Sequence, residues 1–344
     1  MNVKRASIAL DEVRRIGRGD LDPGELLLEV ADTVRNVVPF DLAGLLLLDP
    51  DTLLPLRRDK LGTSGDLDLL GILRNELLAP DVHKYCELAV RYSPAATLSS
   101  LGVLAYESER RREILDPIGL ADELRIVFRH HGSAWGAACL MRASDAAPYD
   151  TDELLFLREI GTEVAPALRR SLARRTTVAL PAAPGVMLLD RELQVTSITA
   201  SARDWRGLMP EESMIAVQAV ALRALDPAAD EASRRGRIRL TTGEWLTARA
   251  APIGGGLGGA GAAAVTLSPA EGSELVTLMA RLHDLTGRES AVVKLLSTGL
   301  PYDAIAQRLS ISRHTLGDHR KSIYGKFSVN SRAELMATLA GQRQ

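Results

Sequence analysis

One stretch near the carboxyl end, from Leu285 to Leu339, constrains the fold of this 344-residue chain more than any other. Thr286 can cap a helix, and Glu289, three residues later, completes a capping box with it. Gly299 then ends that helix. Apolar residues continue at helical spacing to the end of the stretch, so the sequence predicts four short helices joined by tight turns.

The second and third of these helices meet at a turn formed by Ile311 and Ser312. Pro301 fits the first position of the second helix, where its missing N–H costs little, and Ser312 is placed to cap the third. The third helix should bury Leu316, Ile323 and Phe327 and expose a basic face: Arg313, His314, His319, Arg320, Lys321 and Lys326. Two helices joined by a short turn, the second basic outside, have the geometry that places a helix in a DNA major groove.

This stretch resembles the LuxR-type, or GerE-type, helix-turn-helix of bacterial transcription regulators. The resemblance is carried by Leu285-Thr286, Arg288-Glu289, Gly299-Leu300, Ile305-Ala306, Leu309, Ile311-Ser312, Thr315, His319, Ile323, Lys326, Val329 and Ser331-Arg332. It implies double-stranded DNA as a partner and binding as a homodimer. The expected DNA-binding residues are Ser312, Arg313, His314, Thr315, Gly317, Asp318, His319, Arg320, Lys321 and Lys326.

Two of these positions depart from the family pattern. Gly317 stands where the family usually has a basic residue, and it weakens an interior helix position by ~1 kcal/mol relative to Ala. Asp318 repels phosphate, although its carboxylate can accept a hydrogen bond from a cytosine amino group. These departures keep open an interaction protein whose helix-turn-helix no longer binds DNA.

The distribution of charge favours DNA binding. From Leu285 onward the chain has nine Lys and Arg against four Asp and Glu, a local charge of +5. The whole chain carries −2, so the first 284 residues carry −7. A basic end on an acidic body is what we expect of a DNA-binding module joined to modules with another role.

Residues 1–172 form a first predicted domain of α+β class. The expected elements are a helix over 1–18, a helix capped at Asp22-Pro23, strands at Leu42–Leu48 and Leu53–Leu56, a mixed segment from Leu61 to Arg110, strands at Arg125–Arg129 and Trp135–Arg142, and a long helix from Asp150 or Thr151 to Leu172. Helices against one face of an antiparallel sheet are typical of sensor domains. The segment resembles a GAF domain, which implies a ligand pocket between the sheet and the irregular segment but assigns no ligand-binding residue.

A second, smaller α+β domain is predicted at 185–270, after a linker over 173–184. Strands are expected at Gly185–Asp190, Val195–Ile198, Arg235–Leu240, Trp245–Ala251 and Ala262–Leu267, with Pro252 stopping the fourth, and helices at Ala200–Trp205 and Glu211–Leu225. This order resembles a small PAS domain. A connecting helix over 271–284 then leads into the DNA-binding domain at 285–344.

Several other features could indicate a catalytic site or a metal site. His83 and Cys86 lie one helical turn apart, with Cys139 and the pair His130-His131 elsewhere, but we favour no metal and no cofactor. The glycine-rich run 253–261 lacks the Gly-Lys-Ser/Thr ending of a phosphate loop and is interpreted as a hairpin tip. No nucleophile elbow, P-loop or HExxH motif is found, so an enzyme with an attached DNA module is the weaker alternative.

The composition sets the remaining bounds. No run approaches ~18 consecutive apolar residues, so no membrane span is expected. The first fifteen residues become charged too soon for a secretory signal, and two cysteines favour a reducing, cytoplasmic setting. We therefore expect a non-enzymatic, DNA-binding transcriptional regulator. Its two amino-terminal domains would sense a small molecule or partner and control dimeric binding of the helix-turn-helix to DNA.

Overall fold

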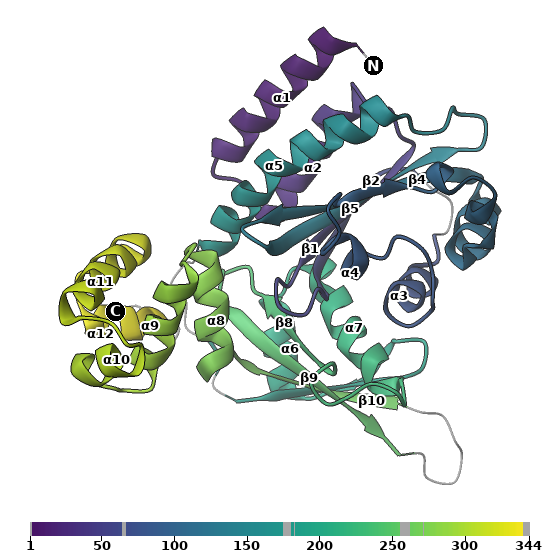
Figure 1. Ribbon diagram of the computed structural model, residues 1–344. Coiled ribbons are helices and arrows are strands. Elements are labelled where there is room, and N and C mark those ends of the chain that lie inside the picture. The colour runs from purple at the N-terminus through teal and green to yellow at the C-terminus, as the bar shows by residue number, and fades with distance from the viewer. Residues whose placement is uncertain are drawn as a thin grey trace.

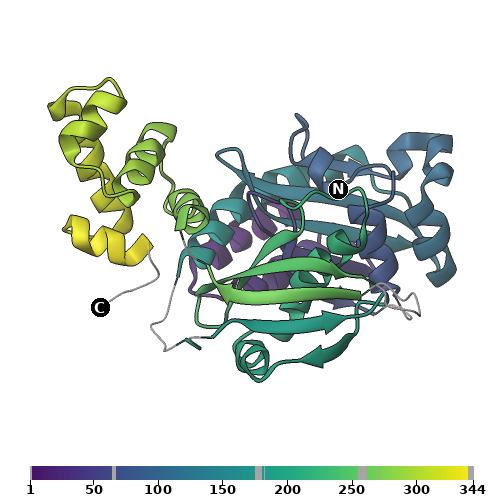
Figure 2. The same ribbon diagram turned by 90° about the horizontal axis from the view of Figure 1, so that it is seen from below.

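The computed structural model describes residues 2–63, 67–174, 180–181, 183–254, 262–270 and 272–339. Along the chain it contains an α+β unit, a second unit built on another sheet, and a helical unit at the carboxyl end (Figure 1). Figure 2 shows the helical unit beside the two sheet units rather than between them. Among the described residues, no helix is both long enough and apolar enough to cross a membrane.

The first unit is an antiparallel five-stranded sheet in the order β2-β1-β5-β4-β3. Its strands are β1 (Leu42–Leu48), β2 (Pro55–Gly62), β3 (Ala95–Thr97), β4 (Leu120–His130) and β5 (Ser133–Ala143). Its helices are α1 (Val3–Arg18), α2 (Pro23–Arg35), α3 (Leu69–Leu77), α4 (Tyr85–Leu88) and α5 (Thr151–Ala173), with short 3₁₀ and π turns between Ser99 and Ile118. The capping boxes Asp22–Glu25 and Asp150–Glu153 start α2 and α5, which confirms the predicted starts of both helices.

The two faces of this sheet differ because successive side chains of a strand point to opposite sides. On β1, Ala43, Leu45 and Leu47 pack in the core beneath α1, α2 and α5. The alternate residues Leu42, Gly44, Leu46 and Leu48 face α3 and α4 and line a cavity there. Helices therefore cover one face closely, and an irregular segment encloses space against the other.

The predicted bounds of two strands in this unit were wrong. The turn after β1 is longer than expected, because Asp49 accepts backbone N–H bonds from Asp51 and Thr52 and Leu53 has a left-handed φ of 59°. Strand β2 therefore runs through polar residues from Pro55 to Gly62 instead of over Leu53–Leu56. Strand β4 starts at Leu120 rather than Arg125 and includes the buried acid Glu123, whose carboxylate accepts from Arg110.

The second unit is also an antiparallel five-stranded sheet, in the order β7-β6-β10-β9-β8. Its elements are β6 (Gly185–Leu189), β7 (Val195–Ile198), α6 (Ala200–Gly207), a 3₁₀ turn (Glu211–Ser213), α7 (Met214–Leu225), β8 (Arg235–Arg239), β9 (Trp245–Ile253) and β10 (Ala262–Pro269). Parts of the predicted linker, at 175–179 and 182, and most of the glycine-rich run, at 255–261, lie outside the described residues.

Pro252 does not stop β9 as predicted, since the strand continues to Ile253. Ala250 donates its backbone N–H to Arg234, on the β8 side of the strand. Pro252, two residues later, faces the same side, beyond the end of β8, whose pairing stops at Arg235 opposite Arg249. Its missing N–H therefore removes no bond from the sheet, which is where proline is tolerated in strands.

Two helices connect the units. Helix α7 packs on β9 and β10 of its own sheet and also on β2 of the first unit, and Leu54 and Leu73 of the first unit belong to the second hydrophobic core. Helix α8 (Gly272–Leu282) packs on α5 and on the next helix, α9 (Gly287–Ser297). The carboxy-terminal unit continues with α10 (Tyr302–Arg308), α11 (Arg313–Phe327) and α12 (Arg332–Leu339), labelled in Figure 1.

Candidate nucleic-acid interface

The turn between α10 and α11 is built as the sequence predicts. Ser312 has extended backbone angles and its hydroxyl accepts the N–H of Thr315 at 3.0 Å, so it caps α11. The Thr315 hydroxyl also lies 2.9 Å from that of Ser312. Leu316, Ile323 and Phe327 are buried, which confirms the inner side of α11. On the second helix, Pro301 is the cap residue and α10 starts one residue later than expected.

The outward side of α11 follows from the buried residues and the helical period of about 100° per residue. His314, Asp318 and Lys321 project roughly opposite Leu316, and all three are exposed, with Gly317 beside them. The His314 Nε2 lies 3.8 Å from an Asp318 carboxylate oxygen. The Lys321 ammonium has no ion-pair or hydrogen-bond partner within the described ranges, so it is the cation available on this face.

Arg313 and Arg320 point toward α10 instead. Arg313 donates to the Asp303 carboxylate at 2.7 Å, although both side chains are largely exposed. The Arg320 guanidinium lies over the Tyr302 ring, 5.2 Å from its centroid, and the Tyr302 hydroxyl is 3.1 Å from that of Tyr324. Burial, followed by the bond to Tyr302, raises the pKa of Tyr324 to about 12. These contacts fix α11 against α10, and they leave both arginines at the edge of the outward face.

Lys326 does not face solvent as predicted. Its ammonium is half-buried and donates to a carboxylate oxygen of Glu289 and to the carbonyl of Asp284, both at 2.8 Å. Burial acts to raise the pKa of Glu289, but hydrogen bonds from Lys326, Ser322 and Thr286 outweigh it and hold the pKa at about 2. Lys326 therefore joins the end of α11 to the capping box of α9. His319 is likewise half-buried rather than freely exposed.

Residues 283–339 match the family model described as "Bacterial regulatory proteins, luxR family". This carboxy-terminal segment is a LuxR-type helix-turn-helix domain. Its capped α11, the preceding turn and the short α10 are the elements that the family resemblance predicted.

A curated relative matches the LuxR-type domain. It is an Aeromonas salmonicida protein named as an HTH-type transcriptional regulator in the exeN 3′ region, 51% identical over 51 residues. The match covers 15% of this chain and about a quarter (26%) of the relative's length. It therefore concerns the DNA-binding domain alone.

Solved GAF-domain structures are similar to part of this chain. The GAF domain of an Acinetobacter phosphoenolpyruvate-protein phosphotransferase is 12% identical, with a TM-score of 0.32, and the match covers 49% of this chain and 94% of that one. A GAF domain/HD domain protein from Geobacter sulfurreducens is 19% identical, with a TM-score of 0.32 and coverages of 44% and 94%. The phycoerythrobilin-bound GAF domain of a cyanobacterial phytochrome is 13% identical, with a TM-score of 0.36 and coverages of 49% and 97%.

The candidate metal ligands of the sequence lie in separate places. His83 is buried, with Nδ1 3.2 Å from Arg91, while Cys86 is exposed, and the Cys139 thiol is directed at the Gly44 carbonyl at 3.6 Å. The histidines of the β4–β5 turn do meet a carboxylate that the sequence analysis missed, Asp284, at the end of the connecting segment.

His131 Nδ1 lies 2.7 Å from Asp284 Oδ1, and the two histidine rings stack at 3.9 Å. Burial and the neighbouring His131 lower the pKa of His130, which disfavours its charged form. This contact joins the β4–β5 turn to the start of the LuxR-type domain. No local sequence signal reveals it, because 153 residues separate the partners.

Proposed function

We propose that this protein is a DNA-binding transcriptional regulator that acts as a homodimer on double-stranded DNA. The observation that carries the proposal is the exposed outward face of α11, with His314 and the unpaired Lys321, on a capped helix of a LuxR-type domain. The relative named as a transcriptional regulator supports it over the same domain. In this proposal α11 enters the major groove, and Ser312, Thr315, the backbone at Gly317 and the side chain of Asp318 lie nearest the bases.

The phosphate contacts follow from the positions of the cations. Lys321 and His314 face outward, and Arg313 and Arg320 can reach phosphates from the edge by exchanging their present partners. Lys326 and His319 act chiefly within the domain, since Lys326 bonds to Glu289. The α9–α12 arrangement, a compact four-helix domain, supplies the rigid base for this face.

We assign sensing to the two amino-terminal units, the first GAF-like and the second PAS-like. Both sheets have the same strand order when numbered within each unit, namely second, first, fifth, fourth and third, which supports related folds. A ligand that favours one arrangement of these units would change whether two LuxR-type domains reach adjacent major grooves.

The test is a fluorescence anisotropy titration of the full-length protein with labelled duplex DNA at low salt. Binding that weakens steeply with salt is expected from phosphate contacts. Asp318 on the outward face favours a second candidate, an interaction protein whose helix-turn-helix has lost DNA binding. No binding to either random or promoter duplex at low salt would support that candidate and reject the proposal.

A further inference from the structure

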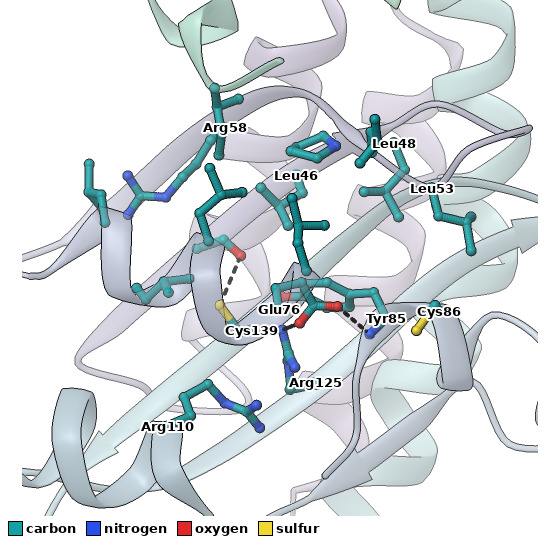
Figure 3. A pocket seen from close by; sticks show the side chains of 18 of the residues that line it. Leu46, Leu48, Leu53, Arg58, Glu76, Tyr85, Cys86, Arg110, Arg125 and Cys139 are labelled. Carbon is teal, nitrogen blue, oxygen red and sulfur yellow. Dashed lines mark hydrogen bonds and ion pairs between the residues drawn. The ribbon is translucent and has the colours of Figure 1, made fainter. Parts of the chain in front are cut away.

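The strongest unassigned feature is the cavity on the face of the first sheet that α1, α2 and α5 leave uncovered. Its volume is about 100 Å³, and its walls are mostly aliphatic side chains from β1, the following turn and α3 (Figure 3): Leu42, Leu46, Leu48, Leu53, Leu54, Leu69, Ile72, Leu73 and Leu77. At roughly 10–15 Å³ for each water-sized position, it holds a molecule of about seven to ten non-hydrogen atoms.

One side of the cavity holds charged groups that are ion-paired with one another. Arg125 donates to Glu76 at 2.7 Å and its guanidinium lies 3.8 Å from the centroid of the Tyr85 ring, while Arg110 donates to Glu123 at 2.8 Å. The second oxygen of Glu76 accepts the backbone N–H of Tyr85. Figure 3 shows Arg110 and Arg125 together on this side. Both arginines on this side of the cavity therefore already have a carboxylate partner.

Arg58 is different. It enters from β2, apart from Arg110 and Arg125 in Figure 3, and lines the cavity. It has neither a hydrogen-bond nor an ion-pair partner in the part of the chain that the structure describes. Its neighbour Arg57, on the other face of the strand, is paired with Asp59 and Asp22. Burial lowers the pKa of Arg58 and outweighs the opposing effect of the neighbouring Asp59 carboxylate.

A second polar group in the cavity is also unsatisfied. The Tyr85 hydroxyl is buried and makes no hydrogen bond of normal geometry to the described residues, although the Cys139 thiol is near enough to interact with it electrostatically. A half-buried guanidinium and a buried hydroxyl that both lack a partner cost free energy, and an acceptor beside them lowers that cost. A carboxylate suits the planar fork of an arginine best.

We propose that this cavity binds a small amphipathic carboxylate, with its hydrocarbon part among the leucines and its carboxylate on the Arg58 guanidinium. This inference rests on the proposed function, in which the amino-terminal units sense a ligand, and it names the chemical class of that ligand. Ile215 of α7 lines the same cavity, so the bound molecule touches both sheet units. Nucleotides are too large for this volume, and an ammonium ligand would face Arg58 without a free carboxylate to receive it.

The experiment is isothermal titration calorimetry of the full-length protein with octanoate, 1-octanol and octylamine, which share one chain and differ in the head group. Octanoate should bind at least ten-fold more tightly than octanol, and octylamine should not bind. Arg58→Met should weaken octanoate at least ten-fold and leave octanol unchanged, and Arg58→Lys should restore part of the loss. Lys60→Met removes an exposed cation of the same strand outside the cavity and should change neither ligand.

Circular dichroism of Arg58→Met checks that the fold is kept, and Leu46→Trp, which fills the cavity, should abolish binding of both octanoate and octanol. The proposal is overturned if octanoate does not bind, if octylamine binds as well as octanoate, or if Arg58→Met binds octanoate normally. DNA binding is measured separately by anisotropy. A protein that binds octanoate but not DNA would support this site and reject the proposed function. A protein that binds DNA but not octanoate would reject this site and support the proposed function.

Discussion

Arg281, on the helix that leads into the LuxR-type domain, forms an ion pair with Asp51, with 2.8 Å between its Nε and a carboxylate oxygen. It also donates to the Ser133 hydroxyl at 2.7 Å. Asp51 belongs to the β1–β2 turn, whose next residues, Thr52 to Pro55, line the cavity of Arg58. One ion pair therefore joins the wall of the candidate ligand cavity to the helix that carries the DNA-binding domain.

Arg281→Gln should loosen α8. The pair is partly exposed, so its loss should cost about 1 kcal/mol or less, equivalent to about two- to five-fold faster amide exchange over α8. Hydrogen exchange with mass spectrometry on the full chain measures this. Arg288→Gln, which removes an exposed arginine from α9, is the matched control, and equal exchange rates in the two variants would contradict the assigned role of Arg281.

Glu289→Gln should destabilise the LuxR-type domain. The carboxylate is buried and accepts from Lys326 and Ser322, and the fall of its pKa from 4.5 to about 2 corresponds to about 3 kcal/mol at neutral pH. Exchange of α9 and α11 amides should be at least ten-fold faster than in the unchanged protein. A variant as well protected as the parent would show that this network does not hold the domain together.

The same carboxylate predicts a pH dependence. Because its pKa is lower in the folded state, its stabilisation is complete above the unfolded pKa of about 4.5 and is lost as the pH falls toward about 2. The stability difference between the parent and Glu289→Gln should therefore shrink over this window. Urea denaturation at pH values across it tests the trend, and a difference that grows on acidification would have the wrong sign.

Gly317→Ala should stabilise α11 by ~1 kcal/mol, because glycine is the poorer helix former and an added Cβ meets no atom within 4 Å. Gly299→Ala is the contrasting variant. Gly299 has a φ of +83°, which alanine adopts only with strain, so that change should destabilise the same domain. Chemical denaturation of the two variants should move in opposite directions from the parent.

Local signals in the sequence predicted the helix starts well. The Thr286–Glu289 capping box and the Ser312 cap are where the pattern places them, since each depends on residues three positions apart. The predicted strand bounds were wrong where contacts with residues distant in the sequence decide them. Glu123 belongs to a buried strand because Arg110 neutralises it, and Pro252 stays in β9 because its neighbour strand has ended.

The exposed and buried sides of α11 were predicted in part. The basic side of α11 follows from the sequence, whereas the withdrawal of Lys326 depends on Glu289, 37 positions earlier. The contact of Asp284 with His131 and the unpaired state of Arg58 also depend on the tertiary structure. Neither follows from residue spacing, because each is set by how separate units pack together.

The central claim is that the outward face of α11 binds DNA. The most direct measurement is the salt dependence of duplex binding for the full-length parent, Lys321→Ala and the control Lys60→Ala, each by fluorescence anisotropy. Lys321→Ala should bind more weakly on all sequences and lower the slope of log affinity against log salt by about 0.9, while Lys60→Ala matches the parent. Identical affinities and slopes for the parent and Lys321→Ala would contradict the account.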